Sequence, residues 1–248
     1  MNTPDKYSEK HRVTYYEADF TRRMTLAMML DIVILASEDQ SEKLRVGSDT
    51  VKKLNMGWVV IQYSIDIQKM PRVNEMITLV TESKYYNKFF AYREFWIKDD
   101  SGNTYVHMTS RWVVMDYKTR KMTKIPNEIV EPYRAEKVVN IPKLPRPVKI
   151  DESSEQVTSN QYRVRYLDID SNQHVNNAHY LDWMVDVLSP EFLNTHTAKH
   201  IDLRYENEVK YGYDVNSKVS FSKNGNDLIS KHEIYSNGKR SASANITW

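Results

Sequence analysis

Apolar positions along the chain follow two periods, and the order of these periods indicates the fold class. Residues 26–36 are apolar around nearly the whole circumference of a helix, which predicts a deeply buried helix. Apolar side chains recur at helical spacing over residues 180–188, which predicts a second, amphipathic helix. Runs rich in β-branched and aromatic residues predict strands at 58–67, 76–83, 89–98 and 105–116. A helix followed by antiparallel strands predicts an α+β fold, a curved sheet around a central helix.

Turn and edge signals occur in both halves of the chain. Residues 99–103 (DDSGN) and 236–239 (SNGK) carry the Asn and Gly that are typical of hairpin turns. Short runs at residues 12–16 and 163–167 predict a strand ahead of each helix. The order of strand, polar loop, helix and further strands therefore occurs twice.

An internal repeat agrees with this doubled order. Residues 13–31 align without gaps on residues 164–182, with six identical positions, where chance gives about one. The identical pairs are Val13/Val164, Tyr15/Tyr166, Asp19/Asp170, Ala27/Ala178, Leu30/Leu181 and Asp31/Asp182. A weaker similarity pairs Gly102 with Gly238 and Trp112 with Trp248. The sequence predicts two copies of one fold.

A proline-rich segment separates the two copies. Residues 126–147 contain five of the eight prolines. Because proline fixes φ and cannot donate to a strand ladder, this segment is expected to be an extended connector. We expect a boundary near residue 140, with an N-terminal domain at residues 1–140 and a C-terminal domain at residues 141–248.

Composition narrows the classes of function. No run approaches the ~20 apolar residues of a membrane helix, and a net charge of +2 argues against general nucleic-acid binding. The absence of cysteine excludes disulfides, thiolate metal sites and cysteine nucleophiles. Glycine-rich phosphate loops and metal-ligand spacings are missing, so neither a cofactor nor a metal is predicted. The first residues resemble neither a signal nor a transit peptide, so we expect a bacterial cytoplasmic protein.

The densest polar segment, residues 168–177 (DIDSNQHVNN), precedes the second helix. Asp170, Asn172 and His174 alternate, so an extended backbone would place them on one face, next to free N–H groups that suit an oxyanion. Those N–H groups belong to Val175, Asn176 and Asn177. A capping loop explains the same residue types, with Asn176 or Asn177 as the cap. Both interpretations stay open on spacing alone.

The two copies differ within this segment. The first copy keeps Asp19, but Thr21 stands in the place of Asn172 and Arg23 in the place of His174. A helix cap would be needed in both copies. Only the second copy carries the imidazole and the amide, which favours a catalytic site in that copy and none in the first.

Residues 170–177 (DSNQHVNN), followed by Tyr180, resemble the signature of acyl-acyl carrier protein thioesterases, the plant plastid enzymes and their bacterial relatives. Residues 15–19 (YYEAD) and 203–209 (LRYENEV) extend the resemblance through most of the chain. The resemblance implies two tandem hot-dog domains. It also implies hydrolysis of fatty acyl thioesters on acyl carrier protein, which ends chain elongation and releases a free fatty acid.

The functional residues implied by this resemblance can be placed individually. The motif Asp, Asn and His fall on Asp170, Asn172 and His174, and the downstream Glu of the family falls on Glu208. Val209 stands where plant enzymes often carry a Cys, so a thiolate mechanism is excluded. Strand alternation would place Glu208 on a solvated face, as an ordinary surface carboxylate. Its assignment therefore depends on the resemblance, together with either contact between this face and the site or a bulge that redirects the residue.

Two mechanisms are compatible with this set. In the first, water attacks the thioester carbonyl, with Glu208 or His174 as general base. In the second, Asp170 attacks directly and forms an anhydride. Methionines of the first helix are expected in the core and are candidates for the acyl pocket, which the resemblance places in the N-terminal domain. These methionines are Met24, Met28 and Met29.

An acidic acyl carrier protein would dock on a basic patch, although an ordinary solvated surface explains the same residues equally well. The candidates are Lys118, Arg120, Lys121, Lys124, Lys143, Arg146 and Lys149. Two other functions remain open. One is a thioesterase acting on coenzyme A, and the other is a hot-dog protein that binds acyl thioesters without turnover. The sequence does not predict the oligomeric state.

Overall fold

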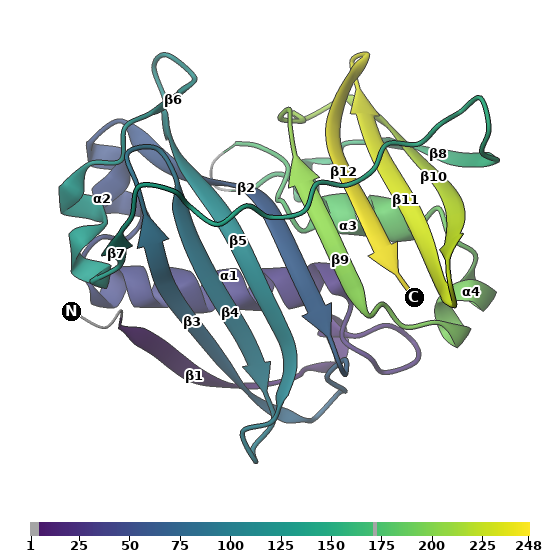
Figure 1. The fold of residues 1–248 in the computed structure, drawn as a ribbon, viewed down its shortest axis with the longest axis horizontal. Coiled ribbons are helices and arrows are strands. Elements are labelled where there is room, and N and C mark those ends of the chain that lie inside the picture. Colours follow the sequence, from purple (N-terminus) through teal and green to yellow (C-terminus); the bar gives the residue numbers. More distant parts are fainter. Residues whose placement is uncertain (1–4, 171–172) are drawn as a thin grey trace.

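The computed structural model describes residues 5–170 and 173–248, and within these residues a single sheet runs through the molecule (Figure 1). The first half contributes β1 (Lys6–Arg12), β2 (Met56–Ile67), β3 (Met76–Tyr86), β4 (Ala91–Lys98), β5 (Thr104–Asp116), β6 (Lys121–Thr123) and β7 (Glu136–Lys137). The second half contributes β8 (Val157–Arg163), β9 (His200–Tyr205), β10 (Asp214–Asn224), β11 (Asp227–Ser236) and β12 (Lys239–Thr247). The helices are α1 (Leu26–Lys43), α2 (Ser48–Lys53), α3 (His179–Val185) and α4 (Pro190–Thr195), with 3-10 turns at Tyr15–Glu17, Asn127–Ile129, Glu131–Tyr133 and Tyr166–Asp168.

Strand order is symmetric about the middle of the sheet. Within the described residues the order is β1-β3-β4-β5-β2-β9-β12-β11-β10-β8, and neighbouring strands are antiparallel. Each half has the same order from the centre outward, and α1 and α3 lie behind the sheet (Figure 1). The predicted α+β fold is confirmed: a tandem double hot-dog, each unit a curved antiparallel sheet on a central helix.

The buried first helix is longer than the sequence pattern predicts. α1 begins after Thr25, whose Oγ1 accepts a hydrogen bond from the N–H of Met28 at 3.2 Å. It continues past residue 36 to Lys43, and Gln40 in its last turns is buried. The side chain of Gln40 is satisfied there because Arg93 on β4 donates to its Oε1 at 2.6 Å. Because Arg93 on the sheet satisfies Gln40, the buried face of α1 continues beyond its last apolar residues.

The second helix is short. α3 ends at Val185, but all the apolar positions predicted for one face between Tyr180 and Leu188 are buried. None of the helices in the described residues combines the length and apolar character needed to cross a membrane.

The strands predicted at residues 12–16 and 163–167 are wrong, because β1 and β8 end where those runs begin. The runs form 3-10 turns instead, each closed by a buried carboxylate. Glu17 accepts a hydrogen bond from the N–H of Thr14 at 2.7 Å, and Asp168 accepts one from the N–H of Arg165 at 2.8 Å. The real strands β1 and β8 are polar and lie at the two edges of the sheet, so apolar patterning does not find them.

The proline-rich linker is extended in only one of its two parts. Its first part, residues 126–137, instead forms two 3-10 turns and β7, and its larger apolar side chains are buried. Its second part, after β7, is extended as predicted and crosses the face of the sheet opposite the helices (Figure 1). Side chains on that face hold its backbone: Arg111 donates to the carbonyl of Pro142, and Gln62 donates to the carbonyl of Pro145. The domain boundary near residue 140 stays a prediction.

A histidine links the two halves where β2 pairs with β9. His200 on β9 contacts two carboxylates, Asp66 on β2 through Nδ1 at 2.8 Å and Asp202 through Nε2 at 3.3 Å. The hydrogen bond to Asp202, followed by that to Asp66, outweighs desolvation and raises the pKa of His200 to about 9. The protonated imidazolium therefore stabilises the junction.

We expect this histidine to make stability fall as pH rises. Because the pKa is raised in the folded state, the contribution is complete below pH 6.5, the ordinary value, and is lost as pH approaches about 9. The melting temperature of wild-type protein should therefore fall more between these pH values than that of His200→Gln. Parallel curves for the two proteins would contradict the proposed ion pairs.

Candidate active site

The polar segment ahead of α3 forms a tight turn. The N–H of Asp170 donates to the carbonyl of His174 at 2.8 Å, and the N–H of Gln173 donates to the carbonyl of Asp170 at 3.0 Å. Gln173 has a φ of 66°, in the left-handed region. A short bridge between Ile169 and Val175 closes the turn. Asn172 lies outside the described residues, so its predicted place beside Asp170 and His174 stays a prediction.

The first copy contains the same turn with different side chains. The N–H of Asp19 donates to the carbonyl of Arg23, the N–H of Arg22 donates to the carbonyl of Asp19, and Arg22 also has a φ of 66°. The carboxylate of Asp19 accepts from the N–H and hydroxyl of Thr21, at 2.8 and 2.5 Å. Arg23 reaches the second half and donates to the carbonyl of Leu193 at 2.9 Å. In the first copy, the side chains of Asp19 and Arg23 therefore make contacts that support the fold.

In the second copy, His174 faces a carboxylate from another element. Its Nε2 lies 3.3 Å from Oε2 of Glu208, and Nη2 of Arg120 lies 2.8 Å from the same nitrogen. Arg120 also forms an ion pair with Glu208. Arg120 belongs to the turn between β5 and β6, so the first half supplies one member of this cluster. The sequence identified Arg120 only as a surface cation, because nothing in the chain indicates that this turn reaches His174.

Glu208 reaches His174 because the strand alternation stops at Tyr205, where β9 ends. The next two backbone N–H groups both donate to the carbonyl of Ser241, at 2.8 and 3.2 Å, so the chain bends. Val209 is then fully buried, and its N–H donates to the hydroxyl of Tyr180 at 3.2 Å. Burial raises the pKa of Tyr180, which keeps this hydroxyl neutral. The bend turns Glu208 toward His174, while its side chain stays 37% exposed. The solvated position expected from alternation therefore holds, and the contact with His174 is added to it.

Of the three backbone donors predicted for an oxyanion, two are already occupied. The N–H of Val175 donates to the carbonyl of Val209 at 3.3 Å, and the N–H of Asn176 donates to the carbonyl of Asp168 at 2.9 Å. These two assignments are corrected, because the segment after β9 occupies the N–H of Val175 and the turn itself occupies the N–H of Asn176. Within the described part of the chain, the N–H of Asn177 makes no hydrogen bond, and Asn177 lines a cavity.

Asn176 has a structural role in the turn, but neither Asn176 nor Asn177 is the cap of α3, because the N-cap position of this helix is Ala178 and carries no side-chain cap. Oδ1 of Asn176 accepts from the N–H of Ala178 at 3.1 Å, and its Nδ2 donates to Oδ1 of Asp31 on α1 at 2.9 Å. Burial raises the pKa of Asp31, and the amide partly offsets this. The turn is thereby fixed against the central helix of the first half.

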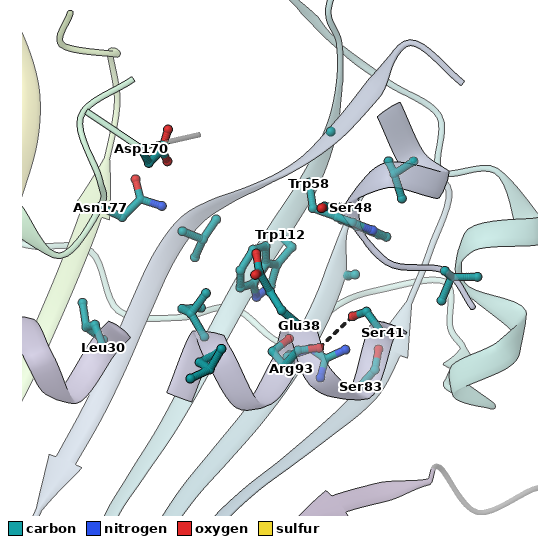
Figure 2. A pocket seen from close by; sticks show the side chains of 18 of the residues that line it. Leu30, Glu38, Ser41, Ser48, Trp58, Ser83, Arg93, Trp112, Asp170 and Asn177 are labelled. Atoms are coloured by element: carbon teal, nitrogen blue, oxygen red, sulfur yellow. Dashed lines mark hydrogen bonds between the residues drawn. The ribbon is translucent and has the colours of Figure 1, made fainter. Parts of the chain in front are cut away.

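Two adjoining cavities meet at this turn. The larger, of about 400 Å³, lies between α1, α2 and the first-half sheet, and the smaller, of about 220 Å³, lies beside His174 and Glu208. Both are lined by Trp58, Tyr117, Asp170 and Asn177, among others. Asp170 and Asn177 stand at one end of the larger cavity in Figure 2. The polar cluster of the second half therefore opens onto a space in the first half.

The methionines proposed for an acyl pocket do not line it. Met24 lies ahead of α1, and Met24 and Met29 are buried in the core, as expected. Met28 packs against the same core. None of the three is among the described residues that line the cavity, so the pocket assignment is corrected. The cavity-lining side chains of α1 include Leu30, Asp31, Ile34, Ser37, Glu38 and Ser41.

Comparison with known proteins gives a consistent family. The acyl-ACP thioesterase N-terminal domain matches residues 4–133, and the acyl-ACP thioesterase C-terminal domain matches residues 151–248. Oleoyl-acyl carrier protein thioesterase 2 of Arabidopsis thaliana is 26% identical over 244 residues, covering 91% of this chain and 65% of that relative. The enzyme of Coriandrum sativum is 25% identical over 233 residues, covering 86% and 62%. The chain thus spans less than two thirds of the length of these two curated relatives.

Solved structures share the whole architecture. A protein from Lactobacillus plantarum, provisionally assigned as an oleoyl thioesterase, is 45% identical with a TM-score of 0.96, covering 99% of this chain and 96% of that one. The 12:0-ACP thioesterase of Umbellularia californica has a TM-score of 0.86 at 19% identity, covering 98% and 93%, which shows the shared fold alone. Together with the two matching family models, these similarities show that the chain belongs to the acyl-ACP thioesterase family.

Proposed function

We propose that this chain hydrolyses the thioester of fatty acyl-acyl carrier protein, which releases a free fatty acid and ends chain elongation. One observation carries the proposal. The His174–Glu208 cluster lines the smaller cavity, and this cavity adjoins the larger cavity of the first half, with Asp170 and Asn177 lining both. Family membership and the names of the curated relatives support the same activity. A cytoplasmic location in a bacterium stays a prediction.

Hydrolysis by water is the mechanism we favour. Glu208 or His174 removes a proton from the attacking water, since both side chains line the smaller cavity. We assign the N–H of Asn177, a residue that lines both cavities, to bind the developing oxyanion. A thiol leaving group with a pKa of about 8.5 needs little protonation. Asn172 is assigned to position water or the carbonyl, on the resemblance alone.

Arg120 is proposed as a positioning residue. Its guanidinium bonds both Glu208 and Nε2 of His174, so it fixes their relative orientation. Both Arg120 and Glu208 approach Nε2 of His174, so the role of this ring nitrogen as donor or acceptor depends on the tautomer of the histidine.

Matched turns in the two copies allow a controlled test of the site. Asp170→Asn should lower kcat by about a hundredfold or more, because it removes a charge beside the reacting carbonyl. Asp19→Asn makes the same change in the equivalent turn of the first copy and should leave kcat unchanged. The measurement is free fatty acid release from acyl-acyl carrier protein. Equal rates for the two variants would contradict a site in the second copy.

Isotope transfer distinguishes water attack from an anhydride. In a single turnover in ¹⁸O-water, we expect label in the released acid and none in the carboxylate of Asp170. Mass spectrometry of the peptide containing Asp170 makes this measurement. Label in that carboxylate would show that Asp170 attacks the thioester and would contradict direct attack by water.

Carrier recognition is assigned to the basic turn beside the site. Lys118 and Lys121 are exposed and flank Arg120. Lys143 and Lys149 are also exposed but belong to the segment between β7 and β8, which crosses the face of the sheet opposite the helices (Figure 1). Reversing the charge of Lys118 and Lys121 to Glu should raise KM for carrier-bound substrate and spare the matched coenzyme A thioester.

The equivalent reversal at Lys143 and Lys149 is the control and should change neither KM. Equal losses on both substrates with the Lys118 and Lys121 variant would overturn the docking assignment. A wild-type preference for the coenzyme A thioester would instead favour an acyl-CoA thioesterase.

A further inference from the structure

Arg93 on β4 brings a guanidinium to the wall of the larger cavity. The residue is only 7% exposed. It lies beside Ser41 and Ser83, away from the end marked by Asp170 and Asn177 (Figure 2). An acyl chain that starts at the proposed site and fills this cavity therefore ends near a buried cation.

Strand register explains why the guanidinium faces open space. Arg93 pairs with Ser83 on β3 and with Ser110 on β5, and Ser110 pairs with Tyr63 on β2. This row of polar side chains crosses the inner face of the sheet, and two small serines flank the arginine. The next row consists of Thr81, Phe95, Met108 and Ile65, all fully or almost fully buried. The polar row therefore separates the packed core from the cavity.

The protein gives Arg93 only neutral partners. Its Nη1 donates to Oε1 of Gln40 at 2.6 Å and to Oγ1 of Thr81 at 2.8 Å, and its Cζ lies 5.0 Å from the ring centroid of Tyr133. Among the described residues, no carboxylate forms an ion pair with Arg93. The hydrogen bonds to Gln40 and Thr81 use the same nitrogen, and the neutral side chain of Tyr133 is a further hydrogen-bond partner. Arginine stays charged even when burial lowers its pKa, as here.

A hydrocarbon chain would make this arrangement unfavourable. Filling the cavity displaces water from around the remaining N–H groups of Arg93, and a methyl or methylene group cannot accept a hydrogen bond from them. A carboxylate accepts two parallel hydrogen bonds from a guanidinium, and a hydroxyl accepts one. An oxygen on the chain would therefore restore the lost interactions.

On the basis of the proposed thioesterase function, we propose that the larger cavity selects acyl chains with a hydrogen-bond-accepting oxygen at the carbon that reaches Arg93. The oxygen belongs to a hydroxyl or a carboxylate group. Arg93 is the residue that determines this specificity, and the hydroxyls of Ser41 and Ser83 lie close by. Turnover still takes place at the thioester end, near Asp170 and Asn177.

Matched substrates test the preference directly. Plain, ω-hydroxy and ω-carboxy acyl-carrier thioesters are compared over a series of chain lengths, which moves the oxygen along the cavity. At the length that reaches Arg93, we expect kcat/KM for at least one oxygenated chain to exceed that of the plain chain of equal length by about tenfold or more. The two oxygenated series show whether the hydroxyl or the carboxylate is preferred.

Substitutions assign the preference to one residue. Arg93→Met should bring the ratio of oxygenated to plain chains close to one, while turnover of plain chains persists. Arg93→Lys keeps the charge with a single donor head and should retain part of the ratio. Arg111→Met, on the neighbouring strand but facing the linker, is the matched control and should keep the wild-type ratio.

Binding separates this inference from the thioesterase function. Calorimetry with non-hydrolysable acyl-pantetheine amides, plain and oxygenated, measures selection without turnover. Wild-type protein that hydrolyses and binds plain chains as well as oxygenated ones at every length would overturn the inference and leave the proposed function intact. An unchanged ratio in Arg93→Met would also overturn it. Selective binding without hydrolysis would support the inference and contradict the enzymatic activity.

Discussion

Antiparallel pairing between β2 and β9 joins the two hot-dog units into one sheet, and the candidate site exists only because of this contact. The inward side chains of the junction, Tyr63 and Ile65 on β2 and Ile201 and Leu203 on β9, are almost completely buried and make the two cores continuous. The same pairing brings the turn before α3 against α1, where Asn176 bonds the first helix. A site with polar groups from one unit and a cavity from the other follows from that geometry.

Duplication explains how two turns with matching backbone hydrogen bonds in their described residues carry different side chains. Both copies have the same turn, with the same hydrogen bonds and a left-handed residue at the same place. In the first copy the side chains serve the fold, since Asp19 caps its own turn and Arg23 reaches across to the second half. In the second copy His174 meets Glu208 instead. The structural requirement is on the backbone, so the side chains are free to diverge.

Local patterns in the sequence predict much of this molecule, and long-range contacts limit the rest. The repeat, the buried first helix and the central strands follow from periodicity and identity. The polar edge strands β1 and β8 do not, because no apolar alternation marks them. The approach of Arg120 to His174 depends on contact between two turns that are far apart in the sequence. Which residues of α1 line the cavity depends on which face of that helix packs against the sheet. For this reason the core position predicted for Met24, Met28 and Met29 is correct, but their proposed place beside the acyl pocket is not. Local patterns also do not predict the hydrogen bonds that occupy the N–H groups of Val175 and Asn176, of which the first is a long-range contact.

The central claim is that one site spans both units, with chemistry in the second and chain binding in the first. A crystal structure with a non-hydrolysable acyl-pantetheine amide tests this most directly. We expect the amide oxygen within about 3 Å of the Asn177 N–H and the chain in the larger cavity, between α1 and the inner face of β4 and β5. A chain bound in the second unit, or an amide group far from residues 170–177, would contradict the claim.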